Sequence, residues 1–268
     1  MPRIRTLVLH AVALAAIAPF TFVFFFMVWN SFKPDFLFFE PGVWLFEPTL
    51  SHYQDVIEQS GLLQNLTNSL IVSSIATVIG VACGLMTAYT IARYKLRKLA
   101  LAILFTRMVP YVTMLIPLWL VFSKAGLTNT IPGLVLAHLL ITIPLGVWIL
   151  IAYVEDIPKD LEDAALLDGA SRVQAFWYVV VPLCRPGVIA TAILCFIFSW
   201  NNFQFALVLG GIDVTTAPVS VFQFAGADSG NMGSMLAAAT LVTIPGFILV
   251  LFAQKQMAAG LTVGGISK

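Results

Sequence analysis

Charged residues are scarce in this sequence. Only 10% of the 268 residues are Asp, Glu, Lys or Arg, whereas 60% are hydrophobic and the mean hydropathy is +0.96. Soluble domains carry about 25% charged residues, so this composition excludes an ordinary soluble fold and indicates a protein surrounded by membrane lipid. The net charge of +1 gives no long-range attraction for anions, and we expect no nucleic-acid partner.

Groups that carry out chemistry are also few. The cysteines lack the spacing of redox or metal motifs, and the histidines lie far apart in sequence: Cys83, Cys184, Cys195, His10, His52 and His138. The chain contains neither a Gly-x4-Gly-Lys-Ser/Thr phosphate loop nor a His-Glu-x-x-His motif, and no Ser or Cys has a nearby His base. We therefore expect no catalytic residue, no metal site and no directly bound cofactor. Because the chain lacks this phosphate loop, any energy that it uses must come from a partner or a gradient.

Six apolar stretches dominate the chain, each near the roughly 20 residues that cross a hydrocarbon core. They cover approximately residues 7–29, 70–92, 99–122, 131–153, 188–209 and 235–252. The first is too long for a secretory signal and is followed by further spans, so we expect it to remain uncleaved. Gly80 and Gly84 have the spacing that permits close helix packing. The prediction is an all-α membrane protein with six transmembrane helices.

Basic residues set the expected orientation, because Lys and Arg stay on the cytoplasmic side. With the N-terminus inside, only Lys33 and Lys124 face outward and Arg107 falls within the membrane. The other Lys and Arg residues all fall on the cytoplasmic side: Arg3, Arg5, Arg93, Lys95, Arg97, Lys98, Lys159, Arg172, Arg185, Lys255 and Lys268. Both termini should therefore be cytoplasmic.

Four polar side chains within the predicted spans need partners or a wet cavity. Arg107 could extend its side chain to the cytoplasmic surface, or it could have a gating or structural role. Asn201, Asn202 and Gln204 could hydrogen-bond hydroxyl groups of a solute along a translocation path, or they could join helices together.

The charged segment from Pro158 to Pro182 interrupts the apolar stretches. Pro158 suits a helix start, and strong helix formers follow as far as Gly169, a typical left-handed stop. Ser171 and Gln174 have the capping-box spacing, and Pro182 closes a second helix. This pattern predicts a helix-turn-helix hairpin, although a solvated connecting loop with ordinary caps would have similar features.

The pattern Asp163-Ala164-Ala165, three residues, Gly169, nine residues, Val179-x-Val181-Pro182 resembles the EAA loop of permease subunits in ABC importers. Asp replaces the family's Glu, and Val replaces its Ile and Leu. In that family the hairpin docks into a groove of the ATP-hydrolysing subunit. The resemblance therefore implies ATPase-coupling roles for Glu162, Asp163, Ala164, Ala165, Asp168, Gly169 and Pro182.

The end of the chain is similar to that of carbohydrate importers within this family, in the residues Gly260-Leu261-Thr262-Val263-Gly264-Gly265. The resemblance implies that Gly260, Leu261 and Thr262 contact the ATPase, although small residues also suit a frayed terminus. Three further segments look like those of maltose-type permeases: Asn30-Ser31-Phe32-Lys33-Pro34, Asn68-Ser69-Leu70 and Trp200-Asn201-Asn202-Phe203.

The resemblance implies the type I ABC importer permease fold. Residues 1–65 would hold the first helix and an extracytoplasmic loop, residues 66–257 the core domain with the EAA loop at 158–186, and residues 258–268 a cytoplasmic tail. The expected function is a bacterial inner-membrane permease subunit, not itself an enzyme, for a sugar or related polyhydroxylated solute. Its implied partners are a homologous second permease subunit, an ATP-binding cassette ATPase dimer that holds ATP and Mg, and an extracytoplasmic solute-binding protein.

An ion-coupled secondary transporter is the alternative. It predicts acidic residues within the spans, but every Asp and Glu falls outside them. A membrane enzyme would need catalytic groups that the sequence does not offer.

Overall fold

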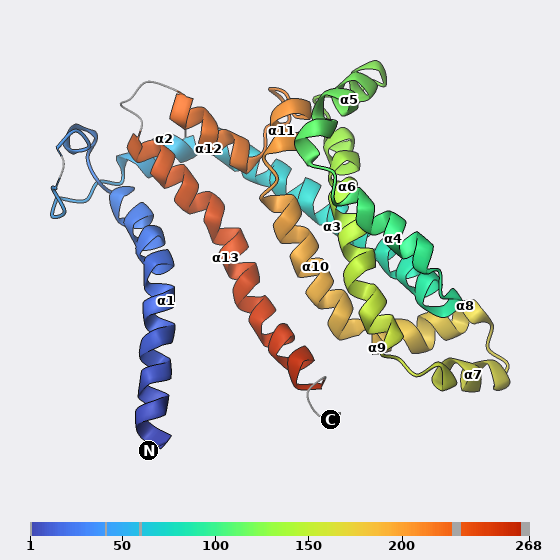
Figure 1. Ribbon diagram of the computed structural model, residues 1–268. Helices are drawn as coiled ribbons and strands as arrows, with labels where there is room; N and C mark the ends of the chain where they lie inside the picture. Colours follow the sequence, from blue (N-terminus) through green and yellow to red (C-terminus); the bar gives the residue numbers. More distant parts are fainter. Residues whose placement is uncertain (1, 41, 59–60, 227–231, 264–268) are drawn as a thin grey trace. The chain divides into compact units, whose positions relative to one another are not determined.

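The computed structural model describes residues 2–40, 42–58, 61–226 and 232–263, in which every regular element is a helix (Figure 1). The all-α prediction is therefore confirmed. Four helices among the described residues contain a stretch long and apolar enough to span a membrane: α1 (Pro2–Asn30), α3 (Leu62–Tyr94), α6 (Ile131–Glu155) and α13 (Met232–Val263). Two bent helix pairs also pass this test, residues 97–124, bent by 86°, and residues 172–200, bent by 74°, so the described residues give up to six spans when each pair is taken as one. The second pair includes residues 172–183, which the prediction assigned to the hairpin and not to a span.

The third predicted span is present as two helices at an angle rather than as one continuous helix. It consists of α4 (Arg97–Thr106) and α5 (Tyr111–Lys124), which meet at an angle of 86°. Pro110 stands at the break, where it offers no N–H and restricts the preceding residue to extended backbone. Arg107 therefore caps the C-terminus of α4, where its positive charge suits the helix dipole.

The fifth predicted span, residues 188–209, is also divided. Helix α10 (Arg185–Trp200) ends before Asn201, and α11 (Gln204–Leu209) starts after a short break. Asn202 Oδ1 accepts a hydrogen bond from the backbone N–H of Phe205 at 3.0 Å, which satisfies one of the first N–H groups of α11. The amide side chains thus lie at a helix junction rather than inside a continuous helix.

The chain divides into two compact units. The first comprises residues 1–63 and 220–244, with α1, the 3₁₀ helix Asp35–Leu37, the short helix α2 (Ser51–Glu58) and the first part of α13. His52 is buried and donates from Nε2 to the Lys33 carbonyl at 2.9 Å. A Cβ on Gly233 would overlap the His52 ring, so the start of α13 packs directly on α2. Helix α12 (Ala217–Gly226) lies mostly in this unit.

The second unit comprises residues 64–219 and 245–268, and its core forms around α3, α6 and α10. Helix α10 packs along α6, and α11 packs on α5 and α6. Helices α3 and α6 cross closely, because a Cβ on Gly84 would lie 3.0 Å from the backbone carbonyl carbon of Gly146. Thr142 Oγ1 donates to the Ala76 carbonyl at 3.0 Å beside this crossing. The predicted close packing at Gly80 and Gly84 is confirmed.

The second span begins earlier than predicted, at Leu62 rather than near residue 70. Asn68 and Ser69 therefore lie inside α3, where both are buried. Asn68 Nδ2 donates to the Thr215 carbonyl at 3.0 Å, and Ser69 Oγ accepts from the backbone N–H of Ala217 at 2.8 Å. These two polar side chains fix the segment before α12 to α3.

Candidate functional site

The predicted hairpin between α6 and α10 is present. Its first helix, α7 (Lys159–Leu167), follows Pro158 and ends at Asp168. Gly169 has a φ of +90°, and its N–H donates to the Leu166 carbonyl at 3.1 Å, while the N–H of Ala170 donates to the Ala165 carbonyl at 3.0 Å. This pair of bonds is the Schellman motif, in which glycine supplies the left-handed residue.

The second helix of the hairpin starts with the predicted capping box. The Gln174 N–H donates to Ser171 Oγ at 3.3 Å, and the Ser171 N–H donates to Gln174 Oε1 at 2.7 Å. The helix then runs through α8 (Arg172–Ala175), a π-helical turn (Phe176–Val180) and α9 (Val181–Leu183), so it ends one residue beyond Pro182. Phe176 and Val180 are buried in one cluster with Val154 of α6. The second helix of the hairpin therefore packs against the hydrophobic core of the second unit.

The outer face of the hairpin is smooth and solvent-accessible. Asp163, Ala164, Asp168 and Gly169 are exposed, and Ala165 is half-buried. A Cβ on Gly169 would meet no atom within 4 Å. Two small side chains flanked by two carboxylates thus form a knob that another protein surface can approach closely.

The inner face of α7 carries Glu162, which is only 5% exposed. Its Oε1 accepts a hydrogen bond from Arg93 Nε at 2.6 Å and forms an ion pair with Arg93 Nη2 at 2.5 Å, and its Oε2 accepts a hydrogen bond from the Tyr89 hydroxyl at 2.8 Å. Sequence reasoning placed Glu162 and Asp163 together at the partner contact. The structure instead turns Glu162 toward α3, and it adds Arg93 and Tyr89, which were missed, to the site. The spacing of Tyr89 and Arg93, one helical turn apart, was the only signal for them.

A cavity of about 300 Å³ lies beside this ion pair, between the hairpin and the end of α3. Arg172 Nη1 donates to the Tyr94 hydroxyl at 2.9 Å along its border. Five of the residues that line the cavity are charged, and the full lining is Tyr89, Arg93, Tyr94, Lys159, Glu162, Asp163, Leu166, Arg172 and Ala175. The hairpin and the end of α3 therefore form one polar assembly.

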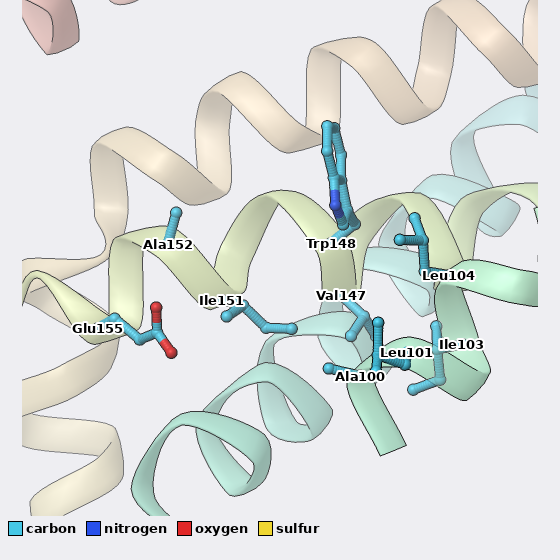
Figure 2. A pocket seen from close by; sticks show the side chains of 9 residues that line it. All are labelled: Ala100, Leu101, Ile103, Leu104, Val147, Trp148, Ile151, Ala152 and Glu155. Atoms are coloured by element: carbon cyan, nitrogen blue, oxygen red, sulfur yellow. The ribbon is translucent and has the colours of Figure 1, made fainter. Parts of the chain in front are cut away.

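A further cavity, of about 440 Å³, lies between α4 and α6. Figure 2 shows Val147 and Ile151 of α6 facing Ala100 and Leu101 of α4, with the carboxylate of Glu155 at one end. A site for a polar solute needs several convergent polar groups. The lining of this cavity offers Glu155 and the ring of Trp148, so it is poorly suited to a polyhydroxylated solute.

The remaining predicted site residues lie away from the hairpin. Asn201 and Asn202 follow the far end of α10, about 24 Å along the helix from its start. Asn201 Nδ2 donates to the Ile197 carbonyl at 2.9 Å, and Gln204 is half-buried at the start of α11. Helix α13 continues through Gly260, Leu261 and Thr262, whereas Gly264 and Gly265 lie outside the described residues. Among the described residues, no group of three or more His, Cys, Asp or Glu could hold a metal ion.

In the described part of the chain, four helices long and apolar enough to span a membrane, together with a charged helical hairpin between α6 and α10, define an integral membrane component with a polar element between its spans. The chain belongs to the family described as "Binding-protein-dependent transport system inner membrane component", whose model matches residues 76–263. The match covers the hairpin, α3 from Ala76 onward and all of α13.

Two curated relatives extend the likeness across the chain. This chain is 38% identical over 224 residues to the trehalose transport system permease protein SugB of Mycobacterium tuberculosis, and the match covers 81% of this chain and 82% of that protein. This chain is also 33% identical over 267 residues to the trehalose/maltose transport system permease protein MalG of Thermococcus litoralis, and the match covers 97% of this chain and 95% of that protein. A crystal structure of a bacterial ABC transporter that imports alginate has the same fold, with a TM-score of 0.70, 23% identity and 95% of both chains covered.

Proposed function

We propose that this chain is the membrane-spanning permease subunit of an ATP-driven importer for a sugar, with a disaccharide as the first candidate. The relatives named above are permeases for trehalose and maltose, and another, 29% identical, belongs to a diacetylchitobiose uptake system. The observation that carries the proposal is the smooth outer face of the hairpin at Ala164 and Ala165, set by the turn at Gly169. Such a face suits docking into a groove of a separate ATPase.

The partners follow from this role. An ATP-binding cassette ATPase dimer would hold ATP and Mg and receive the hairpin, and Gly260, Leu261 and Thr262 would add a contact. A homologous second permease subunit would complete the pathway, and an extracytoplasmic binding protein would deliver the sugar. Asn201, Asn202 and Gln204 stay candidates for the solute path. The family match favours this system over an ion-coupled secondary transporter.

The function can be tested with the complete complex in proteoliposomes, formed with its second permease subunit, ATPase and binding protein. Trehalose, maltose and diacetylchitobiose are offered one at a time, with methionine as the control solute. We expect ATP hydrolysis to rise several-fold with one sugar and that sugar to accumulate inside. Sugar uptake driven by an ion gradient in the absence of ATP would contradict the proposal, as would stimulation by methionine alone.

The orientation of the chain gives a separate prediction. With both termini cytoplasmic, single cysteines at Leu45 and Ile212, which are 89% and 93% exposed, should react with an impermeant thiol reagent added from outside. A cysteine at Leu167, 90% exposed on the hairpin, should react only after the membrane is opened. The background lacks Cys83, Cys184 and Cys195. Labelling at Leu167 in intact cells would contradict the topology.

A further inference from the structure

We propose that Glu162 is a positioning residue that fastens the hairpin to α3, so that movement of the hairpin is passed to this spanning helix. The inference rests on the proposed function of the hairpin as the element that the ATPase moves. It assigns different roles to the two neighbouring carboxylates, Glu162 and Asp163. Asp163 is exposed to solvent, although it also lines the cavity, whereas Glu162 is buried and bonded to Arg93 and Tyr89.

The ion pair between Glu162 and Arg93 is buried and fixes the position of α7 on α3. The side chains of Arg93 and Glu162 are 12% and 6% exposed, so each charge has little access to water and depends on the other as its partner. Glu162 accepts two hydrogen bonds, one from Arg93 Nε and one from the Tyr89 hydroxyl, and its carboxylate also forms an ion pair with Arg93 Nη2. Charge-assisted bonds of this kind are shorter and stronger than neutral ones, and they fix the direction of both groups. Helix α7 therefore cannot shift along α3 without breaking the network.

The guanidinium joins three segments at one point. Besides Glu162 of α7, Arg93 Nη2 donates to the Ile157 carbonyl at 3.2 Å, in the turn between α6 and α7. Arg93 itself lies in the last turn of α3, the helix that crosses α6 at Gly80 and Gly84. A displacement of the hairpin thus acts directly on the end of a long, closely packed helix. On the other side, the Tyr89 ring contacts the Phe176 ring at 5.0 Å between centroids, which adds the second hairpin helix.

The test compares near-isosteric variants in the assembled complex. Glu162→Gln removes the charge and keeps the shape, Arg93→Lys keeps the charge and loses the forked geometry, and Asp163→Asn is the matched control on the outer face. We expect Glu162→Gln and Arg93→Lys to retain the ATPase on purification and to hydrolyse ATP, while sugar transported per ATP falls about tenfold. Asp163→Asn should instead weaken retention of the ATPase.

A rescue experiment separates mechanical linkage from a purely structural role. In a cysteine-free background, cysteines at Tyr94 and Arg172, whose side chains touch, are joined by a short bifunctional maleimide. We expect this covalent link to restore much of the sugar transported per ATP in Glu162→Gln, and single cysteines treated likewise to restore none.

Two results would overturn the inference: wild-type transport per ATP in both inner-face variants, or a loss that the cross-link does not repair. Either leaves the proposed function standing if the wild-type complex still shows sugar-stimulated ATP hydrolysis. Failure of the wild-type complex to show it would instead count against the proposed function.

Discussion

Replacing Gly84 with leucine should prevent the protein from accumulating in the membrane. A Cβ at this position would already lie 3.0 to 3.1 Å from backbone atoms of Gly146 and Val147, so the leucine side chain has no room unless α3 and α6 separate. Overpacking costs about 1–3 kcal/mol where side chains can shift. Because backbone stands in the way here, we expect about 3 kcal/mol or more, roughly a hundredfold in the folded-to-unfolded ratio.

The matched control is Gly246→Leu, the same change in the apolar helix α13, where a Cβ would meet no atom within 4 Å. Membrane abundance and the melting temperature of the detergent-purified protein are measured for both variants. We expect Gly246→Leu to resemble the wild type and Gly84→Leu to be nearly absent. Equal abundance and equal melting temperatures would show that the helices do not depend on this close approach.

Local backbone chemistry explains why the hairpin was predictable. A left-handed glycine after a helix and a Ser-x-x-Gln box act within a few residues, so the sequence contains all the information they need. Both appear in the structure at Gly169 and at Ser171 with Gln174. The crossing of α3 at Gly80 and Gly84 was predictable as a close contact, but its partner Gly146 was not, because small residues are common in spans.

The breaks between helices were harder to predict. Pro110 stands where two helices meet at 86°, whereas Pro117, Pro144 and Pro245 lie inside continuous helices. Neighbouring packing can satisfy the carbonyl that a proline frees, so the residue alone does not decide between a break and a continuous helix. The same limit applies at Asn201 and Asn202, which read as part of one apolar stretch.

Glu162 and Asp163 show a different limit. Adjacent positions on a helix point about 100° apart, so only one of the two can face α3. The residue that decides, Arg93, lies 69 positions earlier in the chain. A local motif supplies no sign of such a distant partner, and the motif alone assigned both carboxylates to the same contact.

The turn at Gly169 should matter more for transport than for stability. Valine there would be forced toward a φ of +90°, a conformation that costs an L-residue about 1–2 kcal/mol and is worst for a β-branched side chain. No atom lies within 4 Å of a Cβ at this position, so the effect acts only through the backbone. Relief of the strain would rotate α7 against α8 and misdirect Ala164 and Ala165. Ala165→Asp would place a charge at the same face without changing the turn.

We expect both variants to reach the membrane at normal abundance and to lose sugar uptake by more than about tenfold, the scale of a coupling energy. ATP hydrolysis should become insensitive to the loaded binding protein, or the ATPase should dissociate.

Gly42→Val is the matched control, because Gly42 has a φ of +94° and also has no atom within 4 Å of a Cβ, but it lies outside the hairpin. This variant should carry similar strain and keep its uptake within about twofold of wild type, the spread usual for surface changes. Uptake, ATPase rate and membrane abundance are measured side by side. Equal uptake by Gly169→Val, Ala165→Asp and Gly42→Val would mean that the angle and surface of the hairpin do not carry the signal from the ATPase.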